Sequence, residues 1–180
     1  AQAIEKTTAD GDAPLPVTLQ GPNPSPGTFY ILQNWNGGQG SIRLTTLTGN
    51  LPNVSWNTTN AVFPTSPQTW TSNTGNVAEQ LGETRRLATN DARISTGVMV
   101  NGNIWCCQHI GVSANNVAVQ WWQLDGNPGA NFGAVLQRGR IGAGLANNYR
   151  YFPGIAVNSN EDVIIGYTVS SNTSRVSCGY

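Results

Sequence analysis

A repeated hairpin is the feature of this sequence that most restricts its fold. The stretch 152–168 places two short apolar segments on either side of a polar turn, a pattern typical of a β-hairpin. Its first segment, 154–158, matches 97–101 at an offset of 57 residues, and its second segment, 163–165, matches 104–106 at an offset of 59. A hairpin that recurs at this distance in a chain without helical periodicity predicts repeated antiparallel sheets.

The remainder of the chain also predicts an all-β fold. Further strands are expected at 28–35, 41–47, 92–100, 103–110, 117–124 and 133–140. The segment 50–80 contains three prolines and is expected to be rich in loops. We therefore predict antiparallel four-stranded blades, about two to four in number, that form part of a β-propeller over residues 28–180. An irregular, extended N-terminal arm is expected at 1–27.

The two ends of the sequence suggest a processed chain. It begins at Ala1 without a methionine, and 175–180 has the character of the middle of a strand, whose edge would be unpaired. We expect a secreted product that is part of a longer chain, or a subunit whose open edge is covered by another chain.

Charge in this chain is sparse and balanced. Nine basic and nine acidic residues give no net charge, and charged residues are 10% of the chain, against about a quarter in soluble proteins generally. This balance argues against nucleic acid or an anionic membrane surface as a partner. No apolar run approaches the roughly 20 residues of a membrane span. Asn, Thr, Ser and Gly replace the missing charge, as suits the surface of an extracellular all-β protein.

Five segments carry a resemblance to a known family: 87–93, 103–105, 119–125, 137–141 and 152–158. Together they resemble secreted bacterial proteins with a sialidase-like β-propeller, a group mostly without an assigned function. The resemblance covers residues 80–180 well and 28–50 loosely, and it implies a propeller that continues past this chain. It does not transfer an activity, and the arginine triad, Tyr–Glu pair and Asp acid/base of true sialidases are not recognisable as a set.

The densest charged cluster is the candidate catalytic site of a glycoside hydrolase. It contains Glu83, Arg85, Arg86, Asp91 and Arg93. Two carboxylates about 5–10 Å apart can perform glycoside hydrolysis, and Glu83 and Asp91 are the pair in this cluster. Arg86 and Arg93 would bind an acidic sugar. The alternative is a network of ion pairs that holds one blade to the next.

Tryptophans are the candidate glycan-binding residues. Trp121 and Trp122 are adjacent in a predicted strand, so their indoles face opposite sides of the sheet. An exposed indole beside amide side chains is a platform on which a sugar ring can stack. Trp35 is a further candidate platform, and Arg93 a candidate polar contact. The alternative is that both indoles of the pair pack between adjacent blades.

The only histidine and the three cysteines allow several roles. Cys107 and His109 share one face of a predicted strand, which fits a nucleophile pair or half of a metal site. The other interpretation is a buried, hydrogen-bonded histidine. An odd number of cysteines in a secreted chain predicts one disulfide and one free or intermolecular thiol. Cys178 could pair with Cys107, the candidate taken here, or with Cys106, and apolar packing of the cysteines is the alternative.

The turn of the last hairpin is a minimal candidate for a calcium site. Asn158, Asn160 and Asp162 supply oxygen atoms there, fewer than the six or more that calcium usually takes. We expect no organic cofactor.

Two functions from different classes follow from the sequence. The first is a secreted, non-enzymatic β-propeller for surface attachment, extracellular assembly or glycan binding, with glycans or other chains as partners. The second is a glycoside hydrolase that acts on acidic sugars. The neutral polar surface, the unclosed sheet edges and the lack of a recognisable catalytic set favour the first.

Overall fold

The computed structural model describes residues 13–50, 52–62 and 68–180. These residues form β-sheets that are mainly antiparallel, with one 3-10 turn, η2 (Gly37–Gln39), and no α-helix. The predicted all-β class is therefore confirmed. The strands are β1 (Leu15–Pro16), β2 (Thr18–Gln20), β3 (Phe29–Asn36), β4 (Ser41–Asn50), β5 (Asn53–Val62), β6 (Asn73–Ala78), β7 (Leu87–Asp91), β8 (Ile94–Val100), β9 (Asn103–Ser113), β10 (Asn116–Asp125), β11 (Val135–Ile141), β12 (Asn148–Val157), β13 (Val163–Ser171) and β14 (Ser174–Gly179).

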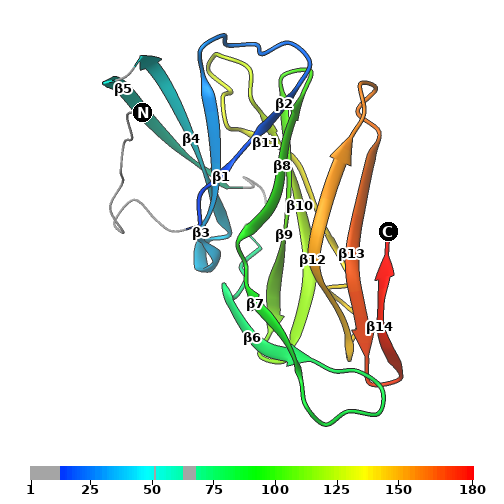
Figure 1. Cartoon of the computed structure of the whole chain (residues 1–180). Helices are drawn as coiled ribbons and strands as arrows, with labels where there is room; N and C mark the ends of the chain where they lie inside the picture. Colours follow the sequence, from blue (N-terminus) through cyan, green and yellow to red (C-terminus); the bar gives the residue numbers. More distant parts are fainter. Residues whose placement is uncertain (1–12, 51, 63–67) are drawn as a thin grey trace.

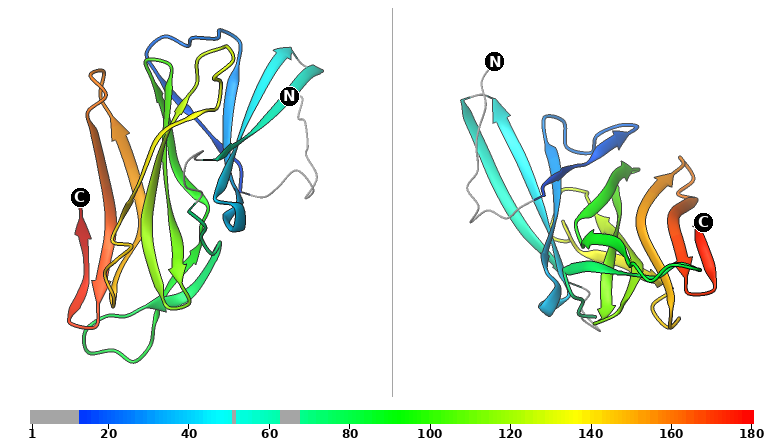
Figure 2. Two further views of the ribbon diagram at one scale, coloured as in Figure 1. Left: turned by 180° about the vertical axis from the view of Figure 1, so that it is seen from behind. Right: turned by 60° about the horizontal axis from the view of Figure 1, so that its bottom comes forward.

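Three sheets are stacked in the order in which the chain forms them. The first sheet has the strand order β1-β3-β4-β5, the central sheet β11-β10-β9-β8-β2 and the last sheet β12-β13-β14. Strands β6 and β7 form a separate pair. Figure 1 shows the first sheet on the left, the central sheet in the middle and the last sheet on the right. Both views in Figure 2 also place the central sheet between the other two, with left and right exchanged in the view from behind.

The inner strands of the central sheet, β8, β9 and β10, are buried on both faces. Their residues on one side join the first sheet in an apolar cluster that includes Leu32, Leu44, Met99, Ile104 and Trp122. Their residues on the other side join the last sheet in a cluster that includes Val98, Trp105, Cys107, Ile155 and Val157. Successive residues of a strand face opposite sides, so this double burial accounts for the nearly continuous apolar character of β8 and β9.

The repeated sequence forms two hairpins that lie in adjacent sheets. β8 and β9 are joined by Asn101 and Gly102, both with positive φ (50° and 83°), as a tight type I′ turn requires. The equivalent hairpin of β12 and β13 has the longer turn 158–162. The two turns are in contact, because the Nδ2 atom of Asn101 donates a hydrogen bond of 2.9 Å to the carbonyl oxygen of Ser159. The two copies of the repeated hairpin are therefore in contact with each other across adjacent sheets.

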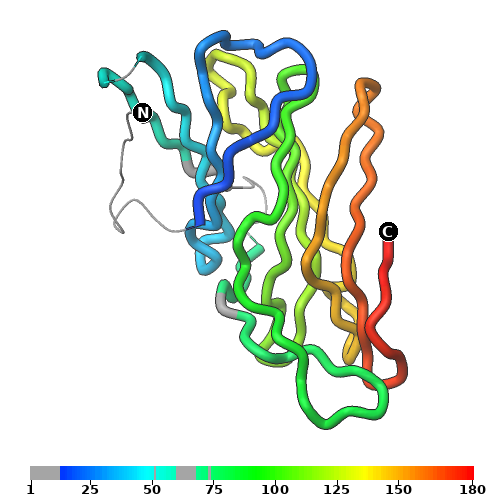
Figure 3. Tube along the Cα trace, in the orientation of Figure 1, coloured from blue at the N-terminus to red at the C-terminus, as the bar shows by residue number. Residues whose placement is uncertain are grey.

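Two segments are more regular than the sequence predicted. The 50–80 segment contains β5, which pairs with β4 from Ser41 to Asn50, and β6. The described part of the N-terminal arm contributes β1 to the first sheet and β2 to the central sheet, where β2 runs parallel to β8. Figure 3 follows this segment across the two sheets. Backbone pairing with long neighbouring strands offsets the weak local patterns of both segments.

The first sheet has the expected four strands, whereas the central sheet has five and the last sheet three among the described residues. The meander β8–β11 has four consecutive strands and is joined by β2. The fourth strand of the first sheet is β1 from the arm. The described sheets do not close into a ring.

Replacing Leu32 with alanine should destabilise the first and central sheets together. Leu32 is fully buried in the cluster that the two sheets share, so truncation leaves a cavity and should cost about 2–5 kcal/mol of unfolding free energy. Urea denaturation followed by circular dichroism and tryptophan fluorescence measures this. Leu136→Ala is the control, because Leu136 is 48% exposed on β11, and it should cost less than about 0.5 kcal/mol. Two separate transitions in the Leu32 variant would contradict a shared core.

Candidate functional site

A groove between the central and last sheets is the strongest candidate site. Its volume is about 470 Å³. Strands β9, β10 and β11 supply one wall, and β13 with the turn before it supplies the other. The groove is lined by Trp105, Trp121, Gln137, Ile141, Glu161, Val163, Ile165 and Tyr180. It therefore combines aromatic and apolar walls with a few polar groups, which is the usual composition of a ligand site.

Trp121 forms an aromatic platform in this groove. Its indole is half-buried and stacks on the indole of Trp105, with ring centroids 6.2 Å apart and planes inclined by 26°. Trp105 is itself 4% exposed, so the platform rests on the core. Gly139 on β11 makes room for it, because a Cβ atom there would lie 2.5 Å from the Nε1 atom of Trp121. Trp105 thus supports the Trp121 indole by stacking, and Gly139 leaves the space on β11 that the indole needs.

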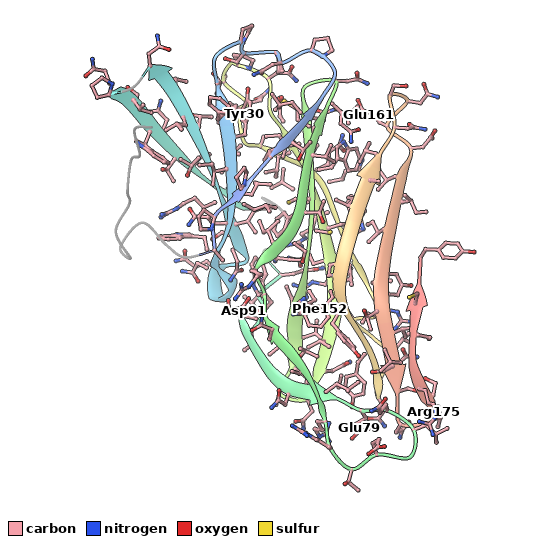
Figure 4. The ribbon with its side chains drawn as sticks, viewed as in Figure 1. Tyr30, Glu79, Asp91, Phe152, Glu161 and Arg175 are labelled. Atoms are coloured by element: carbon pink, nitrogen blue, oxygen red, sulfur yellow. The ribbon has the colours of Figure 1, made fainter. Side chains whose placement is uncertain are left out.

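Glu161 places a carboxylate in the same groove. It lies in the turn between β12 and β13 with a φ of 65°, at the upper end of the last hairpin in Figure 4. The Nδ2 atom of Asn103 donates to both of its oxygens, at 3.1 and 3.3 Å. Gln123 Nε2 donates at 3.3 Å and Asn101 Nδ2 at 3.4 Å. Amides from the central sheet therefore hold the carboxylate.

A chain of amides extends from Glu161 across the central sheet. Gln123 and Gln137 are direct partners on β10 and β11, and Gln137 Nε2 donates a 2.6 Å hydrogen bond to Gln123 Oε1. Gln123 Nε2 in turn donates to Glu161. Because each amide is oriented by the next, the polar wall of the groove is pre-organised.

The two tryptophans of the predicted pair differ in burial and in the residues that they pack against. Trp122 is fully buried, packs edge-on against Trp70 at 5.9 Å and has the guanidinium of Arg138 5.2 Å from its ring centroid. Packing between sheets is therefore its role, as the alternative interpretation held. Trp35 lies against the Arg43 guanidinium on the first sheet, outside the groove. Of the three candidate platforms, Trp121 is the one that lines the groove.

The candidate hydrolase residues do not line one cavity. Asp91 and Arg93 form a two-pronged ion pair at 2.7 and 2.6 Å, and the hydrogen bonds from Arg93 lower the pKa of the Asp91 carboxyl. Arg93 lines a cavity of about 360 Å³ beside His109 and the arm.

Glu83 and Arg86 instead line a cavity of about 560 Å³ in the β6–β7 loop, at the bottom of Figure 3. Arg86 pairs there with Glu79 at 2.7 Å, and Figure 4 shows Glu79 well below Asp91. The arrangement gives ion pairs at two places and does not assemble the predicted carboxylate pair.

His109 is a buried strand residue that borders the arm. It is 2% exposed, its Nε2–H donates to the carbonyl oxygen of Thr89, and its ring packs edge-on against Phe152 at 5.3 Å. Burial lowers the pKa of the imidazole. Phe152 has a φ of 50°, which is unusual for a bulky side chain, and it occupies an irregularity in the β12 register. These contacts support the interpretation of His109 as a buried, hydrogen-bonded residue.

The predicted disulfide is absent, because all three cysteines are free in the structure. Cys106 and Cys107 are fully buried in the central sheet, on its two opposite faces, and Cys178 is exposed on β14 of the last sheet. Burial raises the pKa of the Cys106 thiol, and it raises the pKa of Cys107 to about 12. A thiol that is protonated at neutral pH is a poor nucleophile, so Cys107 is a packing residue of the core between the central and last sheets.

The candidate calcium turn is closed by its own hydrogen bonds. Asn158 Oδ1 accepts from the backbone N–H groups of Asn160 and Asp162, both at 2.9 Å, and its Nδ2 donates to the Asp162 carboxylate. Within the ranges that the structure describes, no three His, Cys, Asp or Glu residues are grouped as a metal would need. The oxygen atoms of this turn therefore stabilise the hairpin.

Comparison with known protein families, with curated proteins and with solved structures finds no match for this chain. Among the described residues, no helix has the length and apolar character to cross a membrane.

One thiol per native chain should react with an exposed-thiol reagent. Cys178 is exposed, whereas Cys106 and Cys107 are buried and protonated. Titration with Ellman's reagent should therefore give one fast thiol in buffer and three in denaturant. Cys178→Ser should abolish the fast reaction. Three fast thiols in the native protein would contradict the burial of the pair.

Acidification should destabilise the fold through His109. Because burial lowers its folded pKa, the unfolded chain binds the proton at a higher pH than the folded chain. The stability that comes from a neutral His109 is complete above the unfolded pKa of about 6.5 and is lost as the pH falls from there toward the lower folded pKa. Urea denaturation between about pH 8 and pH 5 measures this slope. His109→Gln should flatten it, and an unchanged slope in that variant would contradict the assignment.

Proposed function

We propose that this protein is a secreted, non-enzymatic glycan-binding protein built as part of a sialidase-like β-propeller. The observation that carries the proposal is the Trp121 platform in a groove whose rim holds the Glu161 carboxylate and the Gln137 amide. An indole face can stack on the apolar C–H face of a sugar ring, while carboxylate and amide groups bond its hydroxyls. The groove offers both kinds of contact side by side.

The propeller part of the proposal rests on how the sheets follow one another. Runs of consecutive antiparallel strands, β3–β5, β8–β11 and β12–β14, form the body of each main sheet, and the sheets stack face to face in chain order. Radial repetition of such sheets is the principle of a β-propeller. Within the described residues, β14 pairs with β13 alone, so one edge of the last sheet is available to further strands of the same ring or of another chain.

The groove favours binding over hydrolysis. Glycoside hydrolysis by the common mechanisms needs a pair of carboxyl groups on either side of the scissile bond. Glu161 has the one carboxylate side chain among the residues that line this groove. The other candidate carboxylates belong to the ion pair at Asp91 and to the β6–β7 loop. Recognition of a glycan without cleavage is the activity that this set of groups supports.

Trp121→Ala should weaken glycan binding by at least about tenfold, which corresponds to about 1.4 kcal/mol, because it removes the stacking platform. A glycan array identifies the ligand, and titration calorimetry measures its affinity for the purified variant. Phe29→Ala is the control, because Phe29 is 66% exposed on the first sheet and should leave affinity unchanged.

A second pair of variants tests the platform without removing it. Gly139→Ala should displace the indole and weaken binding, since its Cβ would collide with Trp121. Gly166→Ala on β13 is the matched control, because nothing lies within 4 Å of a Cβ there. Binding that survives both Trp121→Ala and Gly139→Ala would remove this groove as the glycan site.

A further inference from the structure

We propose that this groove selects neutral glycans and rejects sugars that carry a carboxylate, such as uronic and sialic acids. This inference rests on the proposed function, and it assigns the class of ligand. It is the opposite preference to that of a hydrolase for acidic sugars, the second function that the sequence suggested. Three features of the groove carry it: the charge of its lining, the direction of β11, and the way in which Glu161 is held.

The first feature is an unbalanced negative charge. Among the residues that line the groove, Glu161 is the one Asp, Glu, Lys, Arg or His side chain. The groups that hold it are the neutral amides of Asn101, Asn103 and Gln123. A ligand carboxylate that entered this groove would meet a like charge between low-dielectric aromatic walls, where repulsion is screened less than in water.

The second feature is the alternation of β11, which points its arginines away from the groove. Gln137, Gly139 and Ile141 pair with Gln123, Trp121 and Val119, so they share the groove face. Arg138 and Arg140 pair with Trp122 and Gln120 on the opposite face.

The contacts of both arginines agree with this placement. Arg138 lies over the ring of Trp122. Arg140 donates to Gln120 Oε1 at 2.7 Å and to the backbone oxygens of Gln68 and Thr69. The two guanidiniums of β11 that could have bound an acidic sugar are therefore engaged on the face of the central sheet that is turned away from the groove.

The third feature is the way in which Glu161 is held. Three neutral amide groups make four contacts with its two oxygens, which equals the roughly four acceptor sites of a carboxylate. Those contacts are 3.1–3.4 Å long, at or beyond the upper end of the usual range for an N–H···O hydrogen bond, so a better-placed donor can replace one of them. A sugar hydroxyl can be that donor and makes a charge-assisted hydrogen bond, whereas a ligand carboxylate has no proton to donate.

The test compares matched neutral and acidic oligosaccharides. The probes are lactose against sialyllactose and galacto-oligosaccharides against oligogalacturonates of equal length. Calorimetry on the full chain at low salt should show neutral probes binding at least about tenfold more tightly than their acidic partners. Added salt should narrow the difference, because screening weakens repulsion between partly exposed charges.

Glu161→Gln identifies the residue responsible. It keeps the shape of the side chain and removes the charge, so the neutral-to-acidic preference should fall to about threefold or less. Glu83→Gln is the matched control, since Glu83 lines the cavity in the β6–β7 loop, and it should leave the preference unchanged. The salt titration of the unmodified protein keeps the test decisive if the Glu161 variant fails to fold.

The possible outcomes separate this inference from the proposed function. Acidic probes that bind as tightly as neutral ones would overturn the selectivity and leave glycan binding standing. Full selectivity in a folded Glu161→Gln variant would overturn the role of Glu161. No binding of any oligosaccharide on the array or in calorimetry would overturn the proposed function, and the inference with it.

Discussion

The burial of the inner strands of the central sheet on both faces is the constraint on which the other features depend. These strands carry apolar side chains on both sides, so the sheet is stable only with a second layer on each side. The first and last sheets supply those layers. This arrangement sets the environment of every side chain on β8, β9 and β10, including the adjacent tryptophans Trp121 and Trp122, which the alternation of β10 sends to different interfaces.

The same stacking builds the groove. Two copies of one hairpin pattern lie in adjacent sheets, and their turns touch through Asn101 and Ser159. Glu161 belongs to the turn of one copy, yet its hydrogen-bond donors belong to the other copy and to β10. The groove therefore arises from the contact between repeats, and no single sheet contains its full set of groups.

The limits of sequence-based reasoning can be seen in particular residues. The strands within 92–124 and the hairpin at 152–168 were predictable because short apolar runs there are bounded by turn residues, a strong and local signal. β5 and β6 were missed because their patterns are weak and depend on pairing partners. The hydrolase cluster was predicted from closeness in sequence, but Glu83 and Arg86 line a cavity in the β6–β7 loop, whereas Arg93 lines another cavity and pairs with Asp91. Glu161 was noted as a turn acid, and nothing near it in sequence indicates its amide partners in the central sheet.

By itself, the sequence determined the all-β class, the repeated hairpin and the rule that Trp121 and Trp122 face opposite sides. These follow from the backbone geometry of a strand and from turn residues, which act over a few positions. Only the tertiary structure decided which indole is buried, that Cys107 and Cys178 remain unpaired, and that Glu161 joins Trp121 in one groove. Those outcomes depend on how whole sheets stack, and contacts between residues far apart in sequence leave no local periodicity from which to predict them.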